Sequence, residues 1–364
     1  MQVENMKKTF LLLITMTALM MGACTQIKNA STVIKVVRQM ADTLASKRLF
    51  PMVKPGEIWL DTDSNMINAH GGGILYHEGT YYWYGEYKGD STYWNPKVPH
   101  WECYRTEAGG VSCYSSKNLV HWKFEGVVLP AEQNDSASDL HFSNVLERPK
   151  VIYNDVTKKF VMWLHVDSHN YAKAASGVAV CDSPTGQFEY LGSMRPNGAM
   201  ARDMTLFKDD DGKAYHIYSS EENSTLYISL LTDDYLRPSG RFTRNFPGAY
   251  REAPAVFKHQ GKYYILSSGC TGWDPNQAQY AMADSMLGEW KVMGNPCSGK
   301  DADITFYGQS THVLKVGENS YMAMFDRWNK TDLINSRYIW LPLTFKGDSI
   351  DIAWQDAWSV STLK

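Results

Sequence analysis

Five segments of this 364-residue chain repeat one pattern. In each segment a polar residue beside a small residue or a proline precedes two apolar residues, a turn and an aromatic-rich strand. The leading positions, spaced 76, 56, 49 and 57 residues apart, are Gly71, Glu147, Asp203, Glu252 and Gln309. A second half of each unit predicts two further strands. Four short strands repeated five times are typical of an all-β, five-bladed β-propeller, and a repetitive β-sandwich is the alternative.

If the fold is a propeller, the five leading residues occupy equivalent positions in the five blades. The innermost strand of each blade lines the central channel, and the leading residues begin these strands. We therefore expect them to converge on one face around the axis. Glu147, Asp203 and Glu252, which lie far apart in the sequence, should then approach one another.

Converging carboxylates point to a sugar hydrolase. Cleavage of a glycosidic bond needs a proton donor for the leaving oxygen and usually a second carboxylate. The acid needs a raised pKa, which a neighbouring carboxylate and an apolar wall can supply. A single Glu at a strand start is more simply a salt bridge or a turn cap, but three in register favour hydrolysis. The aromatic content of 13% fits β-structure, stacking on sugar rings, or both.

Two of these segments, "ARDMTLF" and "REAPAV", resemble glycoside hydrolase family 43, the five-bladed propeller enzymes. The resemblance implies that Glu252 is the general acid and that Asp203 tunes it. The family has an Asp-Pro pair in the first blade, where its Asp is the base. This chain has "AHGGGIL" there, so Gly71 or Gly72 stands where the Asp is expected and His70 is the nearest titratable residue.

The missing Asp, together with segments such as "YYWYGE", "ERPKVIYN", "TGWDPN" and "SRYIWLPL", resembles the exo-β-1,3-galactanase branch of the family. This likeness implies an exo-acting β-1,3-galactosidase that releases galactose from β-1,3-galactan or arabinogalactan. It also implies contacts to the terminal galactose from Glu86, Glu147, Tyr171, Asp203 and Asn223. Gln309 occupies the place of an unusual base or a water-holding group, and the base stays open among His70, Gln309 and Glu147.

Several further residues are candidates for the pocket or the channel. Trp273 is a sugar platform or a core residue, and Arg327 and Trp328 could close the channel. His312 lies where some family members bind a central metal ion, so a structural Ca²⁺ is one interpretation and a buried core histidine the other. The loop 88–110 either walls the pocket with its aromatic residues or packs on itself. Cys270 stands where the branch tends to have a hydroxyl residue.

The N-terminal sequence predicts export. Lys7 and Lys8 precede a short apolar run, and the run ends in Gly22-Ala23-Cys24, which resembles a lipoprotein processing site. We therefore expect a signal peptide over 1–23, lipidation of Cys24, a tether with a short helix over 24–56, and a catalytic propeller over 57–364. The protein would then be a periplasmic or cell-surface lipoprotein of a bacterium. Five other cysteines are scattered, with a Cys103–Cys113 disulfide as one alternative.

Charge and composition limit the partners. A formal net charge of −3 gives no electrostatic reason to expect a nucleic acid. We expect an oligo- or polysaccharide substrate, membrane contact only through the lipid anchor, and no required cofactor. Two functions remain as alternatives: another family 43 specificity, such as α-L-arabinofuranosidase or β-xylosidase, and a catalytically silent glycan-binding propeller.

Overall fold

The structure, a computed structural model, describes residues 52–98 and 101–363. Its main feature is a ring of five sheets, each with four antiparallel strands that follow one another around the ring in chain order. The first blade contains β2 (His70–His77), β3 (Thr80–Lys88), β6 (Ala108–Ser116) and β7 (Lys123–Pro130). The second contains β8 (Val145–Asn154), β9 (Lys159–Asp167), β10 (Ala175–Cys181) and β11 (Glu189–Met194). The third contains β12 (Met204–Lys208), β13 (Ala214–Ser220), β14 (Thr225–Leu231) and β15 (Pro238–Asn245).

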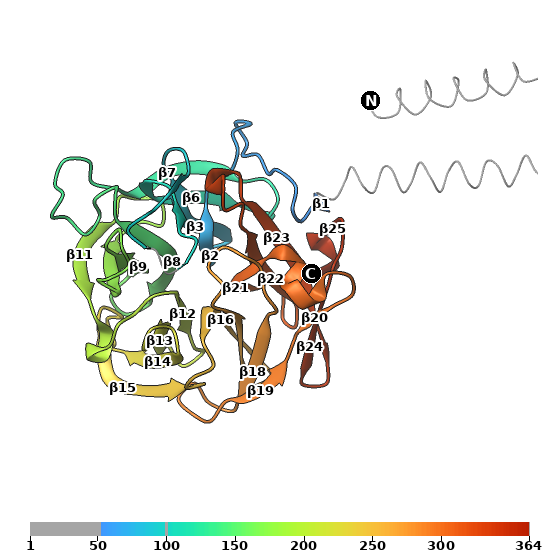
Figure 1. Ribbon diagram of the computed structural model, residues 1–364. Helices are drawn as coiled ribbons and strands as arrows, with labels where there is room; N and C mark the ends of the chain where they lie inside the picture. Colours follow the sequence, from blue (N-terminus) through green and yellow to red (C-terminus); the bar gives the residue numbers. More distant parts are fainter. Residues whose placement is uncertain (1–51, 99–100, 364) are drawn as a thin grey trace, which may run out of the picture. The chain divides into compact units, whose positions relative to one another are not determined.

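The last two blades complete the ring. The fourth contains β16 (Arg251–His259), β17 (Lys262–Gly269), β18 (Gln279–Ala283) and β19 (Lys291–Gly294). The fifth contains β21 (Gln309–Lys315), β22 (Tyr321–Arg327), β23 (Arg337–Lys346) and β24 (Ser349–Ala353), with β20 (Cys297–Ser298) added in parallel. Figure 1 shows β2, β8, β12, β16 and β21 innermost around the common axis. The predicted five-bladed β-propeller is confirmed.

Short elements connect the blades. A two-stranded hairpin of β4 (Tyr93–Trp94) and β5 (Tyr104–Arg105) interrupts the first blade. The 3-10 turns are η1 (Pro196–Gly198), η2 (Ala302–Tyr307), η3 (Leu333–Asn335) and η4 (Val360–Leu363). Within the described part of the chain, no helix has the length and apolar character of a membrane span.

Apolar side chains fill the space between neighbouring blades. Five buried clusters each join two adjacent blades, so the ring has no single central core. The cluster between the fifth and first blades is rich in tryptophan: Trp83 and Trp340 meet edge to face at 4.7 Å. Beside it β1 (Met52–Val53) pairs with β25 (Trp358–Ser359), which ties both ends of the described propeller together. These contacts close the ring and fix the inner strands around the channel.

The start of the inner strands has a recurrent irregularity. The pairing register shifts just after His70, Glu147 and Glu252, as in a β-bulge. The next residue in each case has a left-handed φ: 57° at Gly71, 55° at Arg148 and 51° at Ala253. In the first blade the residue equivalent to the two glutamates is therefore His70, one position before the predicted Gly71.

A second row of polar residues lies directly behind the first. Strand pairing places Glu86 opposite His70 and His165 opposite Glu147. It likewise places Ser268 opposite Glu252 and Asp326 opposite Gln309. The polar groups at this face of the propeller thus come from two strands of a blade, and the sequence pattern identified only one row.

The predictions about the N-terminal segment and the cysteines compare with the structure as follows. The signal peptide over 1–23, the lipidation site Cys24 and the tether helix lie outside the described residues. The tether was expected to reach residue 56, but Met52 and Val53 already pair with the propeller. The alternative disulfide is wrong, because Cys103 and Cys113 are both free and buried.

Candidate active site

A cavity of about 750 Å³ opens where the inner strands begin. Most of the predicted site residues line it: Glu86, Glu147, Tyr171, Asp203, Asn223, Glu252, Trp273, Gln309 and Trp328. The fold therefore brings together residues, such as Glu86 and Gln309, that lie more than 200 positions apart in the sequence. The lining also contains residues that the sequence analysis did not assign to the site, above all Arg148 and His165.

Glu252, at the start of β16, carries the carboxyl group with the raised pKa. Its Oε1 accepts a hydrogen bond from Gln309 Nε2 at 2.9 Å, and Asn223 Nδ2 lies 3.4 Å from Oε2. Burial, followed by the negative charge of Asp203, raises the pKa of Glu252 to about 8. The group is therefore mostly protonated at neutral pH and can donate that proton to a bound substrate.

Asp203, just before β12, is held against Glu252 by two donors. Its Oδ2 lies 2.9 Å from Arg148 Nη2 and accepts the backbone N–H of Ala253 at 3.1 Å. Since Ala253 directly follows Glu252, this hydrogen bond fixes the spacing between the two carboxyl groups. The left-handed φ at Ala253 turns its N–H toward Asp203, so the bulge is part of the site.

Gln309, at the start of β21, makes four hydrogen bonds through its side-chain amide. Oε1 accepts from Arg148 Nη2 at 2.5 Å and from Trp328 Nε1 at 2.8 Å. Nε2 donates to Glu252 Oε1 at 2.9 Å and to Ser268 Oγ at 3.0 Å. Two donors facing the oxygen and two acceptors facing the nitrogen fix the orientation of the amide. Gln309 is thereby held as a neutral neighbour of Glu252.

Glu147, which is partly exposed, belongs to a chain of charged groups whose other members, His165 and Asp167, are buried. His165 Nδ1 lies 3.3 Å from Glu147 Oε2, and His165 Nε2 lies 3.1 Å from Asp167 Oδ2. Burial alone lowers the pKa of His165, but hydrogen bonds to the two carboxylates raise it to about 9. Burial acts in the opposite direction on Glu147, and the hydrogen bond and charge of His165 lower its pKa to about 2. Tyr171 Oη donates to Glu147 Oε1 at 3.0 Å.

This chain of charges predicts a pH-dependent stability. His165→Phe leaves the carboxylates of Glu147 and Asp167 without their cation, which costs about 3 kcal/mol of unfolding free energy. The contribution of His165 is fully present below its unfolded pKa and is lost as the pH rises through about 9. That of Glu147 is present above its unfolded pKa and is lost as the pH falls toward about 2.

Urea unfolding of both forms across pH measures this difference. The gap between wild type and His165→Phe is expected to be widest between about pH 4.5 and 6.5. His121→Phe, at an exposed histidine, is the matched control and should change stability little. A gap for His165→Phe that grows above pH 9 contradicts the assigned charge state.

Aromatic rings form another wall of the cavity, and a lysine lies close to two of them. Trp273 and Trp328 meet edge to face at 5.0 Å, and the Lys88 ammonium lies 5.5 and 5.4 Å from their ring centroids. Lys88 Nζ also donates to Glu86 Oε2 at 2.6 Å. Residues 86 and 88 lie on the same face of β3, because side chains alternate along a strand. Once Glu86 was predicted to be at the site, this spacing could have placed Lys88 beside it. The wall offers flat apolar faces to a sugar ring.

The aromatic loop of the first blade contributes to the same wall. Trp101 lines the cavity and lies 5.8 Å from the ring of Tyr171 and 6.5 Å from that of Trp273. Tyr93 and Trp94 of this loop are instead largely exposed. The loop therefore walls the pocket through Trp101, as one of the two interpretations predicted.

Two predicted site residues do not line the cavity. His70 is fully buried, and its ring stacks on Tyr338 at 5.1 Å between ring centroids. Arg327 turns away and donates through Nη2 to the carbonyl oxygen of Phe306 at 2.8 Å. The side chain of His70 is held against an aromatic ring, and that of Arg327 is held by a backbone carbonyl group. We therefore assign neither residue to substrate binding.

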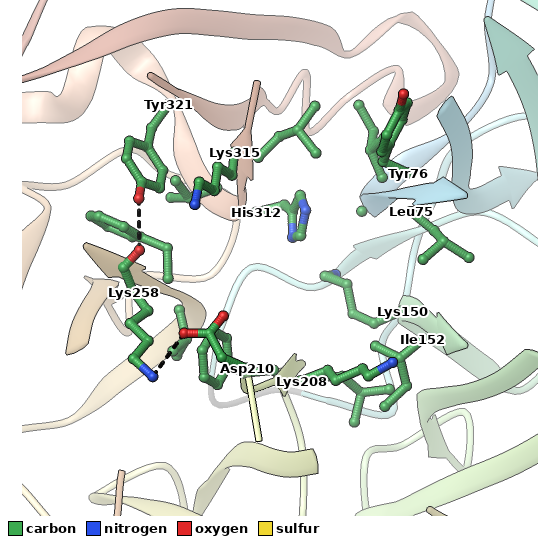
Figure 2. A pocket seen from close by; sticks show the side chains of 18 of the residues that line it. Leu75, Tyr76, Lys150, Ile152, Lys208, Asp210, Lys258, His312, Lys315 and Tyr321 are labelled. Atoms are coloured by element: carbon green, nitrogen blue, oxygen red, sulfur yellow. Dashed lines mark hydrogen bonds and ion pairs between the residues drawn. The ribbon is translucent and has the colours of Figure 1, made fainter. Parts of the chain in front are cut away.

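His312 lies in a second cavity, of about 460 Å³, at the other end of the channel (Figure 2). Later residues of the same five inner strands line it, including Lys150 and the stem of Lys258. Lys150 Nζ donates to the carbonyl oxygen of Gly71 at 2.8 Å. Burial, followed by the charge of Lys150, lowers the pKa of His312 to about 3. His312 is therefore neutral, and burial, followed by the charge of Arg148, lowers the pKa of its neighbour Lys150 to about 7.

The metal prediction for His312 receives no support from this arrangement. Among the described residues, one group of three side chains could supply metal ligands: Glu147, His165 and Asp203. His312 is not part of it. Calcium prefers six to eight oxygen ligands. A structural ion at His312 stays a prediction.

The arrangement as a whole can perform acid-catalysed cleavage of an acetal. It places a protonated carboxyl group next to an anionic partner, together with a second, partly exposed glutamate whose pKa is shifted in the opposite direction. Two carboxyl groups with pKa values moved apart are the usual basis for dividing acid and base roles. The flat aromatic wall suits a sugar as the bound group.

Comparisons with known proteins identify relatives of the chain. The model of the family described as glycosyl hydrolases family 43 matches residues 73–334. A solved structure described as a family 43 β-1,3-galactosidase with galactodeoxynojirimycin is 44% identical, with a TM-score of 0.79 over 84% of this chain and 100% of that chain. An exo-β-1,3-galactanase from Phanerochaete chrysosporium with β-1,3-galactotriose is 35% identical, with a TM-score of 0.76 over 86% of this chain and 70% of that chain.

A curated relative with another specificity is more distant. The β-D-galactofuranosidase of Aspergillus niger is 28% identical over 165 residues, which cover 42% of this chain and 48% of that enzyme. The chain thus aligns with about half the length of this curated relative.

Proposed function

The chain belongs to glycosyl hydrolase family 43, and on this basis we propose that it removes single galactose units from the non-reducing end of a β-1,3-galactan, such as an arabinogalactan backbone. The observation that carries the proposal is the partly buried pair of Glu252 and Asp203 in the cavity. It supplies a proton donor that is protonated at neutral pH.

The choice of galactan rests on the solved structures. Those with the higher identities are described as β-1,3-galactosidases or exo-β-1,3-galactanases, and three Phanerochaete structures contain β-1,3-galactotriose or galactose. The cavity of this chain has polar and aromatic groups that can bind a terminal galactose. Hydroxyl groups of the sugar would bond to Glu147, Tyr171 and Asn223, and one sugar face would stack on Trp273 or Trp328.

The roles follow from the contacts. Glu252 gives its proton to the glycosidic oxygen, and Asp203 keeps the pKa of Glu252 high. Gln309 holds Glu252 in place through its amide nitrogen. The raised pKa of Glu252 argues against the silent glycan-binding alternative, since a lectin needs no proton donor.

We also propose that the protein acts outside the cytoplasm. A basic start, a short apolar run and Gly22-Ala23-Cys24 support a signal peptide followed by lipidation of Cys24. The substrate would then be an extracellular or periplasmic polysaccharide, and the lipid would be the only contact with a membrane. No cofactor is needed for a reaction that two carboxyl groups can carry.

A panel of substrates tests the function. We expect galactose from β-1,3-galactobiose and little release from aryl α-L-arabinofuranoside, aryl β-D-xyloside or aryl β-D-galactofuranoside. Sugar release is measured by chromatography for wild type and for Glu252→Gln, which shows that the release belongs to this site. Preferred release of arabinose, xylose or galactofuranose supports another specificity, and binding of galactobiose without release supports a lectin.

A further inference from the structure

Asp167, the last residue of β9, is a buried carboxylate beside the cavity rather than in its lining. It is 1% exposed, while its neighbours His165, Tyr171 and Arg202 all line the cavity. Burial alone raises the pKa of Asp167, but the hydrogen bond and charge of His165 lower it below its usual range, so the group is an anion. A buried anion is stable only when several donors compensate it, and the donors around Asp167 belong to the site.

One oxygen of Asp167 fixes the loop that carries Tyr171. This oxygen, Oδ1, accepts three backbone N–H groups at 2.9, 2.7 and 2.9 Å, from Ser168, Lys173 and Ala174. These donors lie at both ends of the loop 168–174, and Tyr171 lies within it with a left-handed φ of 59°. A tyrosine keeps such a backbone only where the surrounding structure holds it. Asp167 therefore determines the position of the Tyr171 hydroxyl group, which donates to Glu147 Oε1.

The other oxygen of Asp167 orients His165. Asp167 Oδ2 lies 3.1 Å from His165 Nε2, and the opposite ring nitrogen lies 3.3 Å from Glu147 Oε2. An imidazolium has one N–H group for each of these carboxylates, so the ring is held from both sides. Asp167 thus supports Glu147 a second time, through the imidazole ring and independently of the loop.

Arg202 provides a third connection, which leads to the next blade. Its Nε lies 4.0 Å from Asp167 Oδ2 and, although buried, has no hydrogen-bond partner among the described residues. Nη1 donates to Asn223 Oδ1 at 3.4 Å. Nη2 donates to the carbonyl oxygen of Tyr171 at 3.2 Å and pairs with the exposed Glu222. The negative charge of Asp167 thereby holds the guanidinium group between the Tyr171 loop and Asn223.

We propose that Asp167 is a positioning residue for the terminal sugar, an inference that rests on the proposed glycosidase function. The side chains proposed to bind the galactose hydroxyl groups are Glu147, Tyr171 and Asn223. Asp167 reaches each of them through one intermediate: the His165 ring, the loop 168–174 and the Arg202 guanidinium group, respectively. One carboxylate thus sets the relative positions of three sugar-binding groups on two blades.

The acid pair of Glu252 and Asp203 has other supports, namely Arg148, Gln309 and the backbone N–H of Ala253. Removing Asp167 should therefore weaken sugar binding and leave the chemical step intact.

Kinetics on β-1,3-galactobiose test this division. We expect Asp167→Ala to raise KM by about 10²-fold and to lower kcat by less than about threefold. Asp167→Asn keeps an oxygen for the loop but loses the negative charge, so KM should rise by about tenfold. Calorimetry of galactobiose in the Glu252→Gln background, where turnover is abolished, should show Kd rising by the same factors.

A multiple-mutant comparison separates positioning from a general loss of structure. If Asp167 acts through Glu147 and Tyr171, Asp167→Ala should raise KM by less than about tenfold in the Glu147→Gln/Tyr171→Phe background. A purely structural role would give the same penalty in both backgrounds. Thermal unfolding shows that each variant is folded at the assay temperature.

Asp139→Asn is the matched control. This carboxylate lies outside the cavity lining, accepts hydrogen bonds from Tyr190 and Ser193, and pairs with Lys173 of the same loop. It therefore matches Asp167 in its contacts but has no path to Glu147 or Asn223. The variant should keep the KM and kcat of wild type.

Three results overturn the assignment: a KM for Asp167→Ala within about threefold of wild type, a kcat that falls as far as KM rises, or the full KM penalty in the Glu147→Gln/Tyr171→Phe background. Asp167→Asn decides in the same way if Asp167→Ala does not fold. If the substrate panel shows release of another sugar, galactan is the wrong substrate, and the same variants on the cleaved glycoside still decide the role of Asp167.

Discussion

Replacing Glu252 by glutamine is expected to lower kcat on β-1,3-galactobiose by about 10³-fold. The amide has the size of the carboxyl group and can still accept the hydrogen bond from Gln309, but it has no proton to give to the leaving oxygen. Substrate affinity should change little, because the removed interaction develops in the transition state. Steady-state kinetics and calorimetric binding of galactobiose to the variant measure the two quantities.

Comparing two substrates with different leaving groups shows whether Glu252→Gln has lost the proton-donating step. An aryl galactoside whose phenol is a strong acid leaves without a proton, so the same variant should lose less than about tenfold on it. Glu289→Gln, at an exposed glutamate of the same blade, is the control for the substitution itself. Equal losses on both substrates, or galactobiose rates within tenfold of wild type, would remove Glu252 from the role of acid.

Replacing Asp203 by asparagine should shift the alkaline limb of the pH–rate profile to lower pH. Turnover needs protonated Glu252, so the wild-type rate falls as the pH rises through about 8. Burial is the larger cause of that raised pKa and the Asp203 charge is the second. Removing this charge lowers the pKa of Glu252, while Arg148, which loses its partner, lowers it further.

We expect the limb to move by about one pH unit, and the rate at pH 8 to fall by about 10²-fold once the altered geometry is included. The profile of kcat/KM from pH 5 to 9 reports this value for the free enzyme. Asp211→Asn, at an exposed aspartate of the same blade, should leave the limb in place. A limb that stays at the wild-type pH in Asp203→Asn contradicts electrostatic tuning by Asp203.

The repeat pattern was enough to predict the propeller and one row of the site. Periodic aromatic strands and polar leading residues identified Glu147, Asp203 and Glu252, because each begins a strand that must face the axis. Of the second row, only Glu86 was named, through the family resemblance; the other members depend on which residues pair across neighbouring strands. His165 became visible only when the register placed it opposite Glu147.

The bulges explain the errors of detail. A shift of one residue in the first blade makes His70, rather than Gly71, the equivalent of the two glutamates. The side chain of His70 then packs on Tyr338, out of the cavity. No local sequence signal fixes such a register, because it follows from contacts between blades. The left-handed backbone conformation of Arg148 also has no local signal in the sequence. It places the Arg148 guanidinium group next to Asp203 in the centre of the site.

The order of products from β-1,3-galactotetraose, reduced at its reducing end to the alditol, tests the proposed function most directly. Chromatography of early time points should show free galactose and the reduced trisaccharide in equal amounts, and no galactobiose. NMR should show that galactose first appears as the α-anomer, because water attacks opposite the leaving oxygen. Early galactobiose, or the absence of free galactose, would contradict exo-acting release of single galactose units.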